Sequence, residues 1–290
     1  MIEGIIVQTL VKGSVYAVLA LGFALIFGVA RVLQLSHTAF YMLAAYGIFY
    51  FADQLGWNPI LSVTLSIVVT TGLGLLVYKL FMDRVREHHV TVMLITLALA
   101  MAFSEIMLII FSGQYRSAPS FWHGSFNILG VAVQYQHVLV FLGAGLVLLI
   151  VWVLLSKTRL GLAIRATAQD TEIANLMGIN VSTILFTVMG IASALAAVAG
   201  VLVAPTLVLD PRMLWPPFIM VMAIITLGGL GSIKGSVVGA FILAFVQILV
   251  VFLVPQGAFL QGAVALLVMV IVLIFRPEGL FGIVFEEERL

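Results

Sequence analysis

The sequence predicts an all-α integral membrane protein, a polytopic bundle of eight or nine transmembrane helices with one short helix on the cytoplasmic side. Hydrophobic residues make up 63% of the 290 residues and charged residues only 9%, whereas soluble proteins have about 45–50% and about 25%. The rare charges are separated by uncharged stretches of about the 20 residues that a helix needs to cross a bilayer. The alternating pattern typical of β-barrel strands is not visible.

The stretches without charged residues locate the individual helices. They are 13–30, 32–52, 54–78, 173–209, 213–233 and 235–275. The last stretch is too long for one helix, and Pro255-Gln256-Gly257 divides it, because proline and glycine together favour a turn. We therefore predict hydrophobic helices near 8–29, 33–52, 59–79, 90–112, 138–156, 182–204, 216–231, 236–254 and 260–275. The seventh is short and begins with Pro216-Pro217, so eight or nine helices cross the membrane.

Small residues recur every fourth position in three of these helices. The series are Ala20, Ala24, Gly28; Ala192, Ala196, Gly200; and Gly231, Gly235, Gly239. Small residues at this spacing allow helix backbones to approach closely in lipid. We expect the backbones of these helices to pack closely against neighbouring helices.

The distribution of basic residues predicts the orientation of the chain. If the N-terminus is outside and the helices alternate, ten of the thirteen basic residues face the cytoplasm. These ten are Arg31, Lys79, Arg84, Arg86, Lys157, Arg159, Arg165, Lys234, Arg276 and Arg289. Because positive charge concentrates on the cytoplasmic side, the C-terminus should be cytoplasmic. The first helix lacks a basic leader and a cleavage pattern, so we expect it to be retained.

Several function classes are excluded by composition and motif. Thirteen basic and twelve acidic residues nearly cancel, which argues against nucleic acid as a partner. The absence of cysteine excludes disulfides and thiolate sites, and no catalytic triad, paired carboxylates or metal-ligand spacing is present. The glycine-rich run 228–235 places Lys234 before its last glycine and does not match a phosphate-binding loop. The chain should therefore bind no cofactor and hydrolyse no ATP itself.

The cytoplasmic connection 157–181 carries the most informative pattern. Residues 157–180 read KTRLGLAIRATAQDTEIANLMGIN. Asp170 and Thr171 are good N-cap residues, Glu172 suits a first turn and Gly178 suits a C-cap, which predicts a helix near 171–177. A solvated linker is the alternative interpretation. The mixture of small apolar and polar residues instead favours docking into the groove of another protein.

This connection and three other stretches resemble a known family. The order R-A-x-A-x-D at 165–170, an alanine four residues later and M-G-I-N at 177–180 resemble the coupling segment of ABC importer permeases, in particular the branched-chain amino acid permease family. The other stretches are GSVYAVLALGFALIFGV at 13–29, TLGGLGSIKGSVVGA at 226–240 and FRPEGLFG at 275–282. One departure concerns 34–38, where members often have Asn, an apolar or aromatic residue, Ala, His and Gly, but this chain reads QLSHT.

The resemblance implies a single permease domain over 1–290, with the coupling segment at 157–181, in a bacterial inner membrane. Such a subunit is not an enzyme and forms half of a path for leucine, isoleucine and valine. It pairs with a second, homologous permease. Two ABC ATPase subunits supply ATP and Mg²⁺, and a periplasmic solute-binding protein delivers the ligand. The implied coupling residues are Arg165, Gln169, Asp170, Glu172, Ala174, Asn175, Met177 and Gly178. Among them, Ala174 and Met177 are expected to pack into the ATPase groove.

Polar residues in the hydrophobic segments are candidates for the substrate path, because burying them in lipid costs several kcal/mol. They are Gln34, Ser36, His37, Thr38, Tyr41 and Glu105. The first four form either a simple polar turn or a re-entrant segment that lines the path. Tyr41 suits packing as well as ligand contact, and Glu105 suits a helix–helix contact as well as conduction.

Two further alternatives concern function. The cargo of such a permease could be urea, a short amide or an aromatic acid. A secondary transporter driven by an ion gradient is the rival class; it requires carboxylates in the middle of the membrane, and Glu105 is the obvious candidate.

Overall fold

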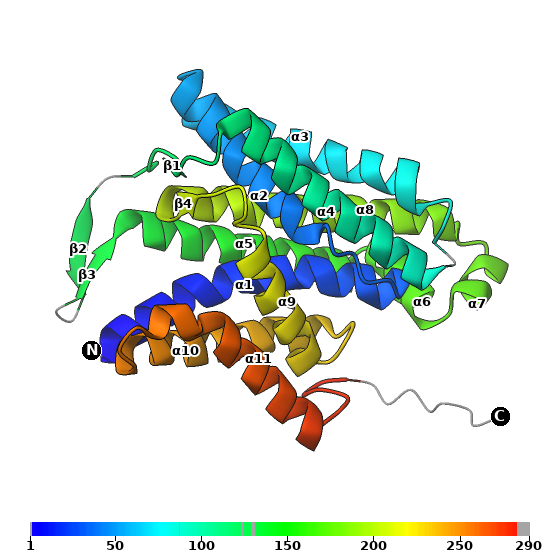
Figure 1. Ribbon diagram of the computed structural model, residues 1–290. Helices are drawn as coiled ribbons and strands as arrows, with labels where there is room; N and C mark the ends of the chain where they lie inside the picture. Colours follow the sequence, from blue (N-terminus) through cyan, green and yellow to red (C-terminus); the bar gives the residue numbers. More distant parts are fainter. Residues whose placement is uncertain (1, 87, 123, 129–130, 283–290) are drawn as a thin grey trace.

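The computed structural model describes residues 2–86, 88–122, 124–128 and 131–282, and these residues form a helical bundle (Figure 1). The helices are α1 (Ile2–Ala30), α2 (His37–Ile48), α3 (Pro59–Val77), α4 (His89–Phe111), α5 (Tyr135–Lys157), α6 (Arg159–Gln169), α7 (Thr171–Leu176), α8 (Val181–Val203), α9 (Trp215–Gly228), α10 (Ile233–Leu253) and α11 (Gly257–Phe275). Short helical turns follow α2 (Phe49–Gln54), α3 (Tyr78–Met82) and α8 (Ala204–Thr206). The predicted all-α membrane fold is confirmed.

Seven helices in the described part of the chain are long and apolar enough to cross a membrane. They are α1, α3, α4, α5, α8, α10 and α11. The helix α9 has 14 residues, or about 21 Å at 1.5 Å per residue, and is shorter than the roughly 30 Å hydrocarbon core. The helix α2 has 12 residues and continues through the turn Phe49–Gln54. These two shorter helices occupy the second and seventh of the predicted segments.

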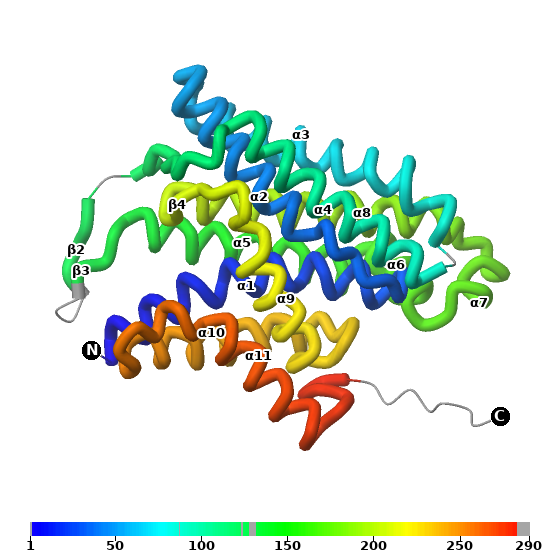
Figure 2. The backbone as a smooth tube through the Cα atoms, viewed as in Figure 1, coloured from blue at the N-terminus to red at the C-terminus, as the bar shows by residue number. Residues whose placement is uncertain are grey.

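The second predicted segment begins later than expected. We predicted a helix from residue 33, but α2 starts at His37, and residues 31–34 have no helical structure. Arg31 has φ +54°, a left-handed conformation that ends α1 and turns the chain back. Figure 2 shows the backbone returning into the bundle before α2 starts. The uncharged run 32–52 could not reveal this, because an extended buried segment is as apolar as a helix.

The middle of the bundle is formed by α1 and α8, which are buried on several sides (Figure 1). A helix that is apolar all round belongs in the interior, and the small residues set the packing distances. A Cβ on Gly200 of α8 would lie 2.9 Å from the carbonyl carbon of Tyr41 in α2, and Gly228 of α9 lies directly against the backbone of Gly235 in α10. The expectation of close backbone approach at Gly200 and Gly235 is confirmed.

The two ends of the bundle carry different structures. At one end, named here the α7 face, α6 and α7 connect α5 to α8; the opposite end, the β2 face, carries a hairpin of β2 (Ser125–Ile128) and β3 (Val131–Gln134) (Figure 1). A second antiparallel pair joins β1 (Arg116–Ser117) to β4 (Val208–Leu209). These short strands were not predicted, because they lie in loops whose pairing depends on contacts between distant residues.

Candidate functional site

The connection between α5 and α8 folds into two helices rather than one. The N-cap residue Thr158 accepts a hydrogen bond from the Gly161 amide at 3.0 Å and starts α6, which was not predicted. Asp170 Oδ1 then accepts bonds from the amides of Glu172 (2.8 Å) and Ile173 (2.9 Å), as expected of an N-cap. The second helix ends at Leu176, one residue earlier than predicted.

The C-terminal end of α7 is closed by a glycine turn. Gly178 has φ +84°, and its amide donates to the Asn175 carbonyl at 3.0 Å. The Ile179 amide donates to the Ala174 carbonyl, also at 3.0 Å. A glycine in this conformation costs no Cβ strain, so the predicted C-cap role of Gly178 is confirmed.

The predicted coupling residues do not all face the same way. Ala174 is 3% exposed and packs inside the chain, so its methyl group is not available to a partner. Leu176 and Met177 are 85% and 79% exposed, and Ile173 is 59% exposed. The other predicted residues, Arg165, Gln169, Asp170, Glu172, Asn175 and Gly178, are also exposed. Ile173, Leu176 and Met177 therefore form an exposed apolar patch on α7 and its C-cap, and the exposed residues Glu172 and Asn175 beside them are polar.

The two connecting helices are tied to the centre of the bundle. Gly161, Ile164 and Thr167 form the buried side of α6, which packs on α5, α1 and α8. Arg31, at the end of α1, donates from Nη2 to the Gln169 carbonyl at 3.4 Å. This hydrogen bond joins the α6–α7 junction to the end of α1.

We expect Asp170→Ala to loosen α7, because it removes the oxygen that holds two amides. Loss of an N-cap costs about 0.5–2 kcal/mol, which is large for a helix of six residues. Hydrogen exchange of the 172–176 amides should become faster, while exchange in α8 stays unchanged. Asp170→Asn keeps an equally good cap and is the matched control; equal protection in the Ala and Asn variants would contradict this role.

The polar residues before α2 lie deep inside the protein. Gln34, Ser36, His37 and Thr38 are all fully buried. His37 Nε2 lies 3.1 Å from the carbonyl of Leu19, which is eleven residues before the end of α1, or about 16 Å along the helix. Residues 31–36 thus re-enter the bundle to about half the depth of the membrane.

This segment forms hydrogen bonds within itself and to α4. Gln34 donates to Ser36 at 3.4 Å, and the Leu35 amide donates to Thr96 of α4 at 3.1 Å. His37 Nδ1 and Thr38 Oγ1 have no hydrogen-bond partner among the described residues. These four residues do not line the cavity of about 490 Å³ near the β2 face or the smaller cavity beside Glu105.

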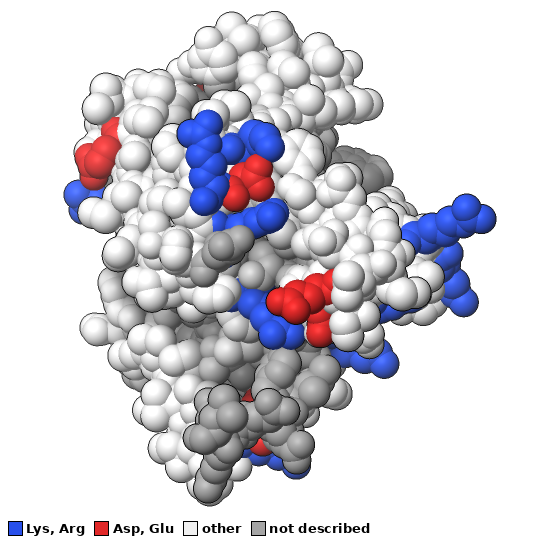
Figure 3. Space-filling view, turned by 90° about the vertical axis from the view of Figure 1, so that its right-hand side faces the viewer, with Lys and Arg blue, Asp and Glu red and all other residues white. Residues whose placement is uncertain are grey.

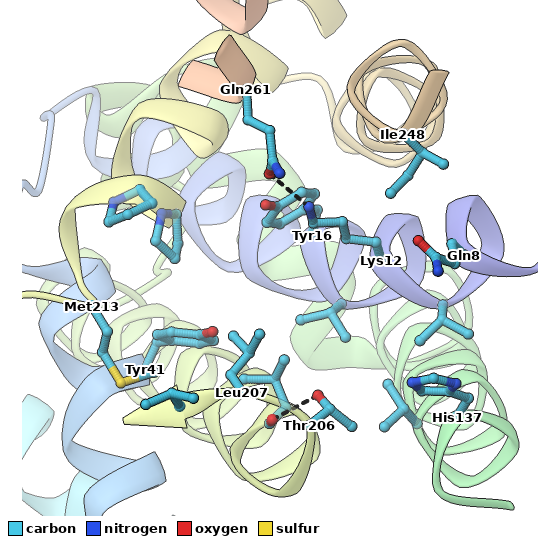
Figure 4. Close-up of a pocket in the computed structure, with 17 residues that line it drawn as sticks. Gln8, Lys12, Tyr16, Tyr41, His137, Thr206, Leu207, Met213, Ile248 and Gln261 are labelled. Carbon is cyan, nitrogen blue, oxygen red and sulfur yellow. Dashed lines mark hydrogen bonds between the residues drawn. The ribbon is translucent and has the colours of Figure 1, made fainter. Parts of the chain in front are cut away.

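A cavity of about 490 Å³ opens near the β2 face. Its lining residues are Gln8, Val11, Lys12, Val15, Tyr16, Tyr41, His137, Val140, Val203, Thr206, Leu207, Val208, Met213, Pro216, Pro217, Ile248 and Gln261. Figure 4 shows Lys12, Tyr16 and Tyr41 around the same space. Tyr41, one turn after His37, is the sequence-predicted path residue that reaches this cavity. The cavity volume lies within the range of about 300–1,000 Å³ that is typical of small-molecule sites.

Glu105 lies apart from both the buried polar residues before α2 and the residues that line the cavity near the β2 face. Its side chain is exposed on α4, and with Asp210 and Arg212 it lines a smaller cavity of about 210 Å³. The neighbouring Ser104 donates to the Pro211 carbonyl at 2.8 Å. Glu105 therefore lies on the outer surface of this chain and not among the buried polar residues of its interior.

Sequence similarity to known proteins covers almost the whole chain. Residues 5–274 match the family described as "Branched-chain amino acid transport system / permease component". The chain belongs to this family. Members of the family are thus membrane components of transport systems.

Individual relatives of this permease agree in length. The high-affinity branched-chain amino acid transport system permease BraD of Pseudomonas aeruginosa is 28% identical, over 96% of this chain and 94% of its own. The corresponding LivH of Escherichia coli K12 is 25% identical, over 93% and 92%. Among solved structures, a chain of PsaBC from Streptococcus pneumoniae, in complex with Fab, superposes with a TM-score of 0.55 at 12% identity, covering 96% of this chain and 97% of that one. This last similarity shows a shared fold.

Three features of the permease were missed from the sequence. The side chain of Ile173 was not singled out, although its spacing of three residues from Leu176 on a helix was visible. The helix α6 was missed because Gly161 and several polar residues weaken the apolar pattern. Lys12 was counted only as an external charge, since its partner Gln261 is 249 residues away in sequence.

Proposed function

We propose that this permease is the membrane subunit of a bacterial ATP-driven importer and that an ATPase subunit docks on α6 and α7. The observation that carries the proposal is the patch of Ile173, Leu176 and Met177. These large apolar side chains are exposed on a capped helix too short to cross the membrane. Exposed apolar groups rimmed by polar ones mark protein–protein contacts.

The proposed orientation places the α7 face in the cytoplasm and the N-terminus outside. Figure 3 views this face and shows that Lys and Arg side chains gather on it. Nine of the ten basic residues predicted to be cytoplasmic lie in or beside the segments that follow α1, α3, α5, α9 and α11, and Arg289 lies outside the described residues. Excess basic charge on one side supports a cytoplasmic location.

The proposed mechanism uses α6 and α7 as a lever. Closure of an ATP-bound pair of ATPase subunits displaces α7, and Asp170 keeps the helix rigid while it moves. The displacement reaches α1 through α6 and the bond from Arg31 to Gln169. The ATPases hold ATP and Mg²⁺. Because they contact the two conformations of the path differently, they favour one conformation over the other. A second, homologous permease completes the path, and an external solute-binding protein supplies the solute.

The proposed cargo is an aliphatic amino acid of the leucine, isoleucine and valine class. The names of the relatives BraD and LivH support this class, and so do the aliphatic and proline side chains that line most of the cavity. Urea offers no apolar group for such walls. The exposed position of Glu105 also disfavours a transporter driven by ions, which needs a carboxylate inside the path.

The decisive experiment measures uptake of tritiated leucine into vesicles that contain the permease with its partner permease and ATPases. With the solute-binding protein outside, we expect uptake that requires ATP and is reduced by unlabelled isoleucine or valine. Competition by urea, acetamide and phenylalanine tests the other cargo classes. Accumulation of solute by this chain alone under an ion gradient would contradict the proposal.

A further inference from the structure

The cavity near the β2 face contains a cation without an acidic partner. Among the described residues that line it, Lys12 is the single lysine or arginine, and none is an aspartate or glutamate. Lys12 forms no ion pair within 4.0 Å with any residue that the structure describes. Its Nζ donates instead to the amide oxygen of Gln261 at 2.9 Å (Figure 4). A partly buried ammonium next to a neutral acceptor retains capacity to bind an anion.

The remaining walls supply an apolar surface beside this ammonium. Val15, Val140 and Ile248 are buried, and Pro216 and Pro217 line the cavity with them. The hydroxyl group of Tyr41 and the amide of Gln8 add hydrogen-bonding groups, whereas the Tyr16 hydroxyl donates to Gln247 Oε1 at 3.5 Å. A cation at one point and aliphatic side chains around it match a small carboxylate with an aliphatic group.

The position of Lys12 along α1 places this cavity at the outer boundary of the membrane. Lys12 and Arg31 are nineteen residues apart, or about 28 Å along a helix. That distance is close to the roughly 30 Å thickness of the hydrocarbon core. Since Arg31 lies at the α7 face, Lys12 lies where a solute released outside first meets the permease.

We propose that this cavity is an outer binding site in which Lys12 holds the carboxylate of the solute and the aliphatic walls hold its side chain. The inference rests on the proposed function and names the chemistry that the site selects. Binding turns the ammonium from Gln261 of α11 toward the carboxylate. Because this hydrogen bond joins α1 to α11, solute binding loosens the contact between these helices.

Direct binding tests this site without the solute-binding protein. The probe is tritiated leucine, measured at equilibrium with the complete transporter in nanodiscs, and leucinamide is the competitor that lacks a carboxylate. We expect Lys12→Gln to weaken leucine binding at least about tenfold, the usual consequence of losing a hydrogen bond to a charged group. Lys12→Arg should retain binding, and leucinamide should compete weakly with leucine on the wild-type protein.

Gln261→Leu separates ligand binding from a structural role of Lys12. It removes the bond between α1 and α11 but keeps the ammonium, so leucine should bind at least as tightly as in the wild type. If Gln261→Leu weakens binding as much as Lys12→Gln, Lys12 only joins two helices and the proposal is overturned. Unchanged binding in Lys12→Gln, or no leucine binding to the wild type, also overturns it. Uptake by the wild-type transporter tests the proposed function separately.

Discussion

A double variant, Leu176→Ser with Met177→Ser, should lose ATP-driven uptake almost completely while remaining folded. Each of these side chains contributes about 1.5–3 kcal/mol when it is buried, so their joint loss weakens ATPase docking about a hundredfold or more. Both are exposed in the permease itself, so its own packing is not affected. Uptake of leucine, co-purification of the ATPase and the melting temperature of the isolated permease measure the three effects.

Leu230→Ser provides the matched control for this variant. Leu230 is also exposed and lies in the turn between α9 and α10, at the same face but outside α6 and α7. We expect it to leave uptake and ATPase retention unchanged. If the double variant transports normally, the exposed patch on α7 is not the docking surface. If the variant fails to fold, Leu176 and Met177 stabilise the permease itself, which contradicts their exposed positions.

The parts of this fold that could be predicted depend on local rules. Charges at the ends of uncharged stretches located the helices, since an isolated charge in lipid is costly. The caps at Asp170 and Gly178 were also predictable, because each requires only the chemistry of one residue and its next few neighbours. The spacing of Ala192, Ala196 and Gly200 correctly indicated a closely packed helix face.

The parts that could not be predicted depend on contacts between distant residues. Whether residues 31–36 continue a helix or return into the bundle is decided by Leu19, Thr96 and the left-handed conformation of Arg31. The orientation of Ala174 toward the protein follows from how α7 lies on α6 and α8. Likewise, Lys12 becomes a candidate for binding the solute only when the folded chain surrounds it with a cavity.

Gly200→Ala should destabilise the permease strongly, although it adds only one methyl group. The new Cβ would lie 2.9 Å from the carbonyl carbon of Tyr41 and 3.2 Å from its Cα. Backbone atoms cannot rotate away as a side chain can, so α2 and α8 must separate. Overpacking of this kind costs about 1–3 kcal/mol, which should lower the apparent melting temperature by about 5 °C. Size-exclusion chromatography of heated, detergent-solubilised protein measures this change.

Gly145→Ala makes the same chemical change in α5, where no described atom outside the adjacent residues and backbone of α5 itself lies within 4 Å of the new Cβ. It should be neutral or stabilising by up to about 1 kcal/mol, because alanine favours helix over glycine. The two variants therefore separate the space at Gly200 from the general effect of removing a glycine. Because Tyr41 also lines the cavity near the β2 face, the fraction of Gly200→Ala that remains folded should transport less leucine per molecule than Gly145→Ala. Equal melting temperatures for both variants would show that α2 and α8 have room to move apart at this crossing.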